Sequence, residues 1–223
     1  MLQGFALHLI IVMVQFRYVG QWQAMNWDTL LALTGFVAVM IGTPGPANAS
    51  AMASGAAVGF IRSLPFLVGI WVGFVVVIFA VAGGLGGLLI ASSAVHGALK
   101  IIGFGYICYL AWKIWQMPDQ NAERVTTRQF GFRDGLFLHP LNPKAYVMLM
   151  VVLSSFVSPE QNYLWQTSII VLVTLFTGVP LNSLWCVSGG VLHRFMQDPG
   201  LRPIISSALS FSMIASVAWA MFV

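Results

Sequence analysis

Two apolar segments of this chain are each interrupted by a short proline-rich stretch, TPGPAN at residues 43–48 and HPLNPK at residues 139–144. Proline has no backbone N–H and its ring clashes with the preceding turn, so each stretch should unwind or kink its helix. Inside a bilayer the freed backbone groups are costly unless they face protein or a water-filled cavity. One such break in each half of a membrane protein is typical of a solute-binding site.

The composition indicates an integral membrane protein. Hydrophobic residues make up 59% of the 223 positions and charged residues only 7%, whereas a soluble domain carries roughly 25% charged residues. The net charge is +4 and the basic residues are scattered over short loops, which argues against a nucleic-acid partner. We therefore expect an all-α integral membrane protein with lipid as its surroundings.

Residues 1–24 fit this picture least well. The apolar run at 5–16 is shorter than the ~20 residues that span a bilayer. It also lacks the basic start and the cleavage site of a signal peptide. The segment is either interfacial or an extension upstream of a true start at Met25, and we favour the second hypothesis.

Six apolar segments follow and predict six transmembrane helices. Their approximate bounds are 28–50, 64–90, 96–116, 133–157, 163–190 and 202–222. We expect residues 25–223 to form a single transporter domain, which a polar linker at 118–130 divides into halves 25–117 and 131–223. With three spans each, the halves enter the membrane in opposite directions. We therefore expect two inverted three-helix halves, with helices 1 and 4 broken at the proline motifs.

Basic residues gather in the loops that follow the first, third and fifth spans. They are Arg62, Lys113, Arg124, Arg128, Arg133, Arg194 and Arg202. The opposite side carries only Arg17 and Lys100. The positive-inside rule then predicts that both termini face outward.

The chemistry of the two breaks favours a zwitterionic solute. At ~1.5 Å per residue both breaks fall in the inner half to middle of a ~30 Å core, so oppositely directed helices bring them together. A half-helix that starts at Pro46 exposes N–H groups and a positive dipole end, which attract a carboxylate. Asn48 and Asn142 offer amides. Lys144 is a cation near mid-membrane and should face the interior.

These considerations define the candidate site and its alternatives. The candidate substrate-binding residues are Pro44, Gly45, Pro46, Asn48, Asn142, Pro143 and Lys144, with His139 and Asn182 as cavity-lining or proton-carrying residues. The breaks could instead be structural kinks, and Lys144 could extend to an interface. His139 could be a packed neutral side chain rather than a proton carrier. Asn182 could serve a helix–helix hydrogen bond.

The sequence lacks the motifs that other classes of function require. The sequence has no His, Cys, Asp and Glu cluster with metal-ligand spacing, no nucleophile with a neighbouring base, and no phosphate-binding loop. We therefore expect no metal, no cofactor and no enzyme. A transport process would run on a gradient or downhill, which leaves a passive channel as the alternative. The oligomeric state stays open, a homo-oligomer included.

The same residues resemble the LysE/RhtB family of amino-acid exporters over essentially 25–223. The resemblance rests on Pro44-Gly45-Pro46 with Asn48, on segments 59–63 and 103–113, and on Asn142-Pro143-Lys144. It implies six spans and proton-coupled export of amino acids or close derivatives across the bacterial inner membrane. Segments 94–96, 110–114 and 153–157 look most like the cysteine/O-acetylserine exporter branch. One departure is Ala47, where the family typically has Asp or Asn.

Overall fold

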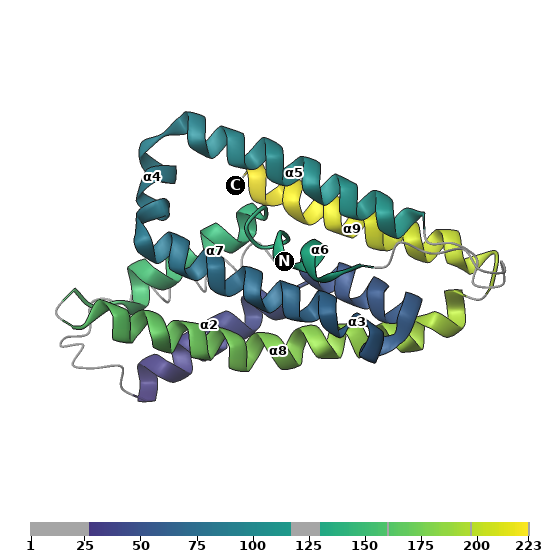
Figure 1. The fold of residues 1–223 in the computed structure, drawn as a ribbon, viewed down its shortest axis with the longest axis horizontal. Coiled ribbons are helices and arrows are strands. Elements are labelled where there is room, and N and C mark those ends of the chain that lie inside the picture. Colours follow the sequence, from purple (N-terminus) through teal and green to yellow (C-terminus); the bar gives the residue numbers. More distant parts are fainter. Residues whose placement is uncertain (1–26, 117–129, 160, 197, 223) are drawn as a thin grey trace, which may run out of the picture.

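The structure is a computed structural model that describes residues 27–116, 130–159, 161–196 and 198–222. Every regular element in these ranges is a helix (Figure 1). The elements are α2 (Trp27–Gly42), α3 (Pro46–Ala80), the π-helical turn η1 (Val81–Leu85), α4 (Gly86–Ala91), α5 (Ser93–Trp115), α6 (Phe132–Leu136), α7 (Pro143–Phe156), α8 (Tyr163–Met196) and α9 (Leu201–Phe222). The predicted extension, its start at Met25 and most of the predicted linker lie outside the described residues.

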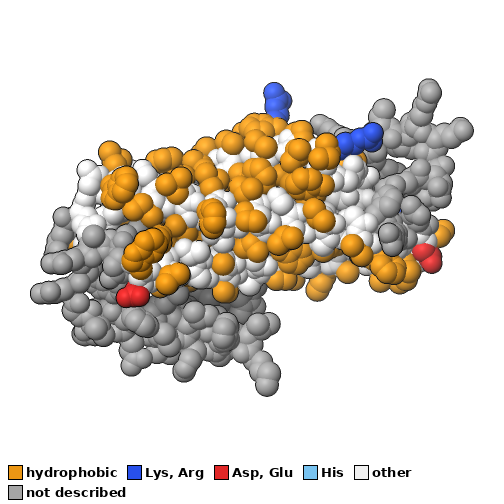
Figure 2. Space-filling model, turned by 90° about the horizontal axis from the view of Figure 1, so that it is seen from below, with side chains coloured by type: hydrophobic (Ala, Val, Ile, Leu, Met, Phe, Trp, Pro, Cys, Tyr) orange, Lys and Arg blue, Asp and Glu red, His pale blue; other side chains and the backbone are white. Residues whose placement is uncertain are grey.

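Four helical stretches of the described chain are long and apolar enough to cross a membrane. They are Pro46–Ala91, Ser93–Trp115, Tyr163–Leu192 and Leu201–Ala218, while α2 and α7 are shorter apolar helices. Hydrophobic side chains run along the bundle in Figure 2, with few charged ones among them. Exposed tryptophans mark both ends: Trp27 and Trp165 lie near the starts of α2 and α8, and Trp112 and Trp115 near the opposite end of the bundle, where α5 ends. Such aromatic belts are typical of the two membrane interfaces.

Helix α3 reverses direction at Gly59, a position that the predicted spans 28–50 and 64–90 left between them. Gly59 has φ 78° and ψ 169°, a conformation that glycine adopts far more readily than other residues. The hydroxyl oxygens of Ser54 and Ser63 lie 2.8 Å apart, whereas nine residues of straight helix would separate them by about 13 Å. The chain therefore folds back here, and we call residues 46–58 the first arm of α3 and residues 60–80 its second arm.

Glycines allow both arms to pack at backbone contact. A Cβ on Gly55 in the first arm would overlap the carbonyl of Cys186 in α8. In the second arm, Gly69 and Gly73 lie directly against α6, whose Gly135 contacts the arm in return. The two arms of α3 are thus fixed to different partners, the first to α8 and the second to α6.

Helix α5 holds the start of the fourth predicted span. The Lys113 ammonium forms an ion pair with Asp134 at 2.8 Å, and the Tyr106 hydroxyl donates to the Asp134 carbonyl at 2.7 Å. The Asp134 carboxylate also accepts from the Gly131 N–H and so caps α6. Gly103 lies against the Leu141 carbonyl. These contacts position the segment between α6 and α7.

Candidate functional site

The first break separates α2 from α3. Helix α2 ends at Gly42 and α3 begins at Pro46, so the span predicted for residues 28–50 consists of two helices. Gly45 precedes α3 in extended conformation, and Pro46 occupies the first helical position, where its missing N–H costs nothing. The first N–H groups of α3 have no partner within the helix and are available to a ligand.

Side chains satisfy the carbonyls that the break leaves at the end of α2. The Asn48 amide nitrogen donates to the Ile41 carbonyl at 2.6 Å and to the Thr43 carbonyl at 3.0 Å. The Thr43 hydroxyl donates to the Met40 carbonyl at 3.0 Å. The geometry of the first break therefore depends on two side chains, one of which comes from the following helix.

The second break lies between α6, which ends at Leu136, and α7, which begins at Pro143. The span predicted for residues 133–157 is likewise two helices. Backbone hydrogen bonds close the connecting turn: Leu138 N–H to Gly135 O, Leu141 N–H to Phe137 O, and Asn142 N–H to His139 O. The Asn142 side chain accepts from the Lys144 N–H at 3.1 Å and so caps α7.

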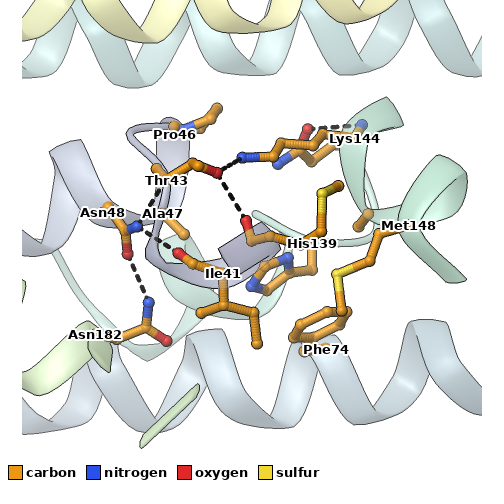
Figure 3. Close-up of a pocket in the computed structure, with 14 residues that line it drawn as sticks. Ile41, Thr43, Pro46, Ala47, Asn48, Phe74, His139, Lys144, Met148 and Asn182 are labelled. Carbon is orange, nitrogen blue, oxygen red and sulfur yellow. Dashed lines mark hydrogen bonds between the residues drawn. The ribbon is translucent and has the colours of Figure 1, made fainter. Parts of the chain in front are cut away.

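The two breaks face one small, partly open cavity of about 40 Å³ (Figure 3). Seven of the nine predicted site residues line it: Gly45, Pro46, Asn48, His139, Asn142, Lys144 and Asn182. Pro44 and Pro143 do not; Pro44 is exposed, and Pro143 is buried at the start of α7.

The prediction missed seven further lining residues. They are Met40, Ile41, Thr43, Ala47, Phe74, Ala145 and Met148. Met148 could have been found, because it lies four residues after Lys144 and thus on the same face of α7. Phe74 belongs to the second arm of α3, and no spacing in the sequence relates it to either break.

Lys144 is a cation without a carboxylate partner among the described residues. It is the second residue of α7, and its ammonium donates to the Thr43 hydroxyl at 2.8 Å. A Cβ on Gly45 would lie 3.5 Å from the ammonium nitrogen, so this charge stands directly beside the start of α3. Two helix starts and a cation converge on the cavity, and this arrangement attracts an anionic group.

Asn48 and Asn182 connect the two halves on the other side of the cavity. Both side chains are buried, and the Asn182 amide nitrogen donates to the Asn48 side-chain oxygen at 2.8 Å. Both amide hydrogens of Asn48 already serve carbonyls at the end of α2. Asn48 thus holds the first break to α8 in this conformation, and little of its hydrogen-bonding capacity is left for a ligand.

His139 forms part of the cavity wall. It is buried and stacks on Phe74 with ring centroids 4.2 Å apart and an interplanar angle of 15°. Its Nδ1 atom has no hydrogen-bond partner among the described residues. No group of three His, Cys, Asp or Glu side chains in that part of the chain could hold a metal ion.

Comparison with known proteins identifies the family of this chain. The family model of the LysE type translocators matches residues 38–221. The chain belongs to the LysE family. Among its relatives, the cysteine/O-acetylserine efflux protein of Salmonella paratyphi A is 33% identical over 168 residues, which cover 75% of this chain and 85% of the relative.

The protein of the same name from Escherichia coli O1:K1 is 31% identical, again over 75% of this chain and 85% of the relative. No solved structure matches. Membership of the LysE family confirms the resemblance seen in the motifs. It also makes the chain a multi-pass membrane translocator rather than an enzyme.

Proposed function

We propose that this LysE-family protein exports cysteine, O-acetylserine or closely similar amino acids from the cytoplasm across the bacterial inner membrane. The observation that carries the proposal is Lys144, a cation without a carboxylate partner among the described residues, in a cavity where two helices begin. The relatives named as cysteine/O-acetylserine efflux proteins supply the substrate class.

The substrate carboxylate would bind the Lys144 ammonium at the start of α7 and the free N–H groups at the start of α3. Pro46 and Pro143 begin these helices, and Pro44 and Gly45 keep the backbone open before α3. The substrate ammonium would donate to carbonyls at the end of α2 and to the side-chain oxygen of Asn142, because a carbonyl oxygen accepts two hydrogen bonds.

The cavity limits the substrate side chain to a small group. Phe74, Met40 and Met148 line the cavity and would contact this group. An unbranched side chain can fit beside methionine, which adapts its shape. This environment suits a thiol or a short ester better than a charged side chain, because a buried charge needs a partner.

The helix contacts support two inverted halves. In the proposed topology α2 and the first arm of α3 make one broken span, and α6 and α7 make another. Helix α2 packs on α8, α6 packs on the second arm of α3, and α5 packs on α9. Rocking of one half against the other would expose the cavity to each side in turn. The basic turn after Gly59 would be cytoplasmic and both termini would face outward.

His139 is the candidate proton carrier, because its Nδ1 atom lacks a partner and its ring lines the cavity. If His139 couples export to the proton gradient, His139→Gln should keep substrate binding and lose the acceleration of export by an imposed pH gradient. A variant that responds to the gradient like the wild type would exclude this role.

Overexpression in a bacterial host, followed by measurement of amino acids in the medium, tests the function. We expect cysteine or O-acetylserine to accumulate outside, against its concentration gradient, and an uncoupler to stop this accumulation. Export that only equalises the two concentrations would favour the passive channel. A medium unchanged from that of the empty-vector control would refute export of these amino acids.

A further inference from the structure

We propose that the Thr43 hydroxyl accepts a hydrogen bond from the Lys144 ammonium in the substrate-free protein. The substrate carboxylate must displace this hydroxyl in order to bind the ammonium. Thr43 would then be a positioning residue that links substrate binding to the separation of the two halves. The inference rests on the proposed function, since it concerns the same cavity. It adds a residue and a step that neither the motifs nor the relatives assign.

The hydroxyl is held in the orientation that this role requires. The Thr43 O–H donates to the Met40 carbonyl at 3.0 Å, so its lone pairs are free to accept from the Lys144 ammonium at 2.8 Å. Met40 lies in the last turn of α2, where the carbonyls carry the negative end of the helix dipole. Thr43 thus connects the cation to the negative end of α2 while no substrate carboxylate is bound.

This bond crosses from one half of the chain to the other. Thr43 follows α2 and Lys144 begins α7, and the two residues are 101 positions apart. The Asn182–Asn48 bond also joins the halves, but it is neutral and buried. The Thr43–Lys144 bond is exposed and contains the cation, so a carboxylate that enters the cavity can replace it directly.

Energetics favour the replacement. The Lys144 ammonium has a Coulomb attraction to a negatively charged carboxylate that it does not have to the hydroxyl, which is a neutral acceptor. Binding of a carboxylate would therefore release the end of α2 from the start of α7. A solute that lacks a carboxylate would leave the Thr43–Lys144 bond in place, so the halves would stay joined there.

The test is the dissociation constant of L-cysteine with purified protein, measured for the wild type, Thr43→Val and Thr43→Ser. Thr43→Val removes the competing hydroxyl and should lower the Kd by about three- to tenfold, the equivalent of one modest hydrogen bond. Thr43→Ser keeps the hydroxyl and should bind like the wild type. Cysteamine, which has the amine and thiol of cysteine without the carboxylate, should show no change with Thr43→Val.

Thr34→Val is the matched control. The Thr34 hydroxyl also donates to a carbonyl of α2, that of Leu30 at 2.7 Å. Thr34 does not line the cavity. This variant should leave the Kd unchanged. Thr43→Ala removes the same hydroxyl as Thr43→Val and repeats the test if the valine variant is unstable.

Two results would overturn the inference. An unchanged Kd in both Thr43→Val and Thr43→Ala would show that the carboxylate does not compete with the hydroxyl, and a serine variant that binds like the valine variant would show that the hydroxyl is irrelevant. Either result leaves the proposed function standing, provided that the wild type binds L-cysteine. A wild type that binds neither L-cysteine nor O-acetyl-L-serine would refute both.

Discussion

The two breaks in this protein have similar sequences and different construction. Both precede a helix that starts with proline, and both face the same cavity. Side chains hold the first break together, because Asn48 and Thr43 cap the carbonyls at the end of α2. The second break is a turn closed mainly by its own backbone hydrogen bonds; the Tyr146 hydroxyl donates to the Pro140 carbonyl, and Asn142 caps the helix that follows.

This difference indicates a division of roles. The second break presents Lys144 to the cavity on a turn that its own backbone hydrogen bonds and contacts from α5 hold in place. The first break is held by bonds that reach α7 and α8. A change at the second break should therefore affect mainly substrate binding, whereas a change at the first break should also affect stability.

Among these substitutions, Lys144→Met is expected to have the largest effect, which is a loss of export. The change removes the cation of the second break while the backbone turn remains, so the protein should insert normally and lose export by at least about 30-fold, because the substrate carboxylate loses its charged partner. Cysteine in the medium and protein in the membrane fraction are the two measurements. Arg133→Met, which removes an exposed cation outside the cavity, should export normally. Full export by Lys144→Met would remove this residue from the mechanism.

A comparison of Asn48→Ala with Asn142→Ala tests the difference between the breaks directly. Asn48→Ala loses three hydrogen bonds and should lower the free energy of unfolding by about 2–4 kcal/mol. Asn142→Ala loses one helix cap, which is worth about 1 kcal/mol. Thermal unfolding of the purified variants gives the order of stability. Equal losses, or a larger loss for Asn142→Ala, would mean that the two breaks are built alike.

Gly45→Ala is expected to have a smaller effect than Lys144→Met. The extended backbone at Gly45 accepts any residue, and the new Cβ would lie at ordinary contact distance, 3.5 Å, from the Lys144 ammonium. Stability should therefore hold, while affinity for L-cysteine falls roughly tenfold because a methyl group fills the carboxylate position. Gly105→Ala, where a Cβ meets open space, is the control. Unchanged affinity in Gly45→Ala would place the carboxylate elsewhere.

Local chemistry explains why much of the site could be predicted. The proline motifs indicated where helices would end, and the cost of an unpaired cation in the membrane indicated that Lys144 would face a cavity. In the structure the predicted spans 28–50 and 133–157 each contain two helices, which are separated at the proline motifs.

The features of the fold and the site that the sequence did not predict depend on tertiary contacts. The reversal lies in the loop predicted between spans 28–50 and 64–90, but its place at Gly59 was not predicted, because a glycine inside an apolar stretch can as well be a packing residue. Phe74 reaches the cavity only because the second arm of α3 is fixed to α6 by glycine contacts. The partner of Asn48 could not be predicted either, because Asn182 lies 134 positions away in α8.

The most direct test of one site shared by both breaks is an experimental structure with L-cysteine bound. We expect the ligand in the cavity between α2, α3 and α7, with its carboxylate at hydrogen-bond distance, about 2.7–3.2 Å, from the Lys144 ammonium. Thr43 should then have turned away from Lys144. A ligand bound outside this cavity, or one whose carboxylate faces neither Lys144 nor the start of α3, would contradict the account.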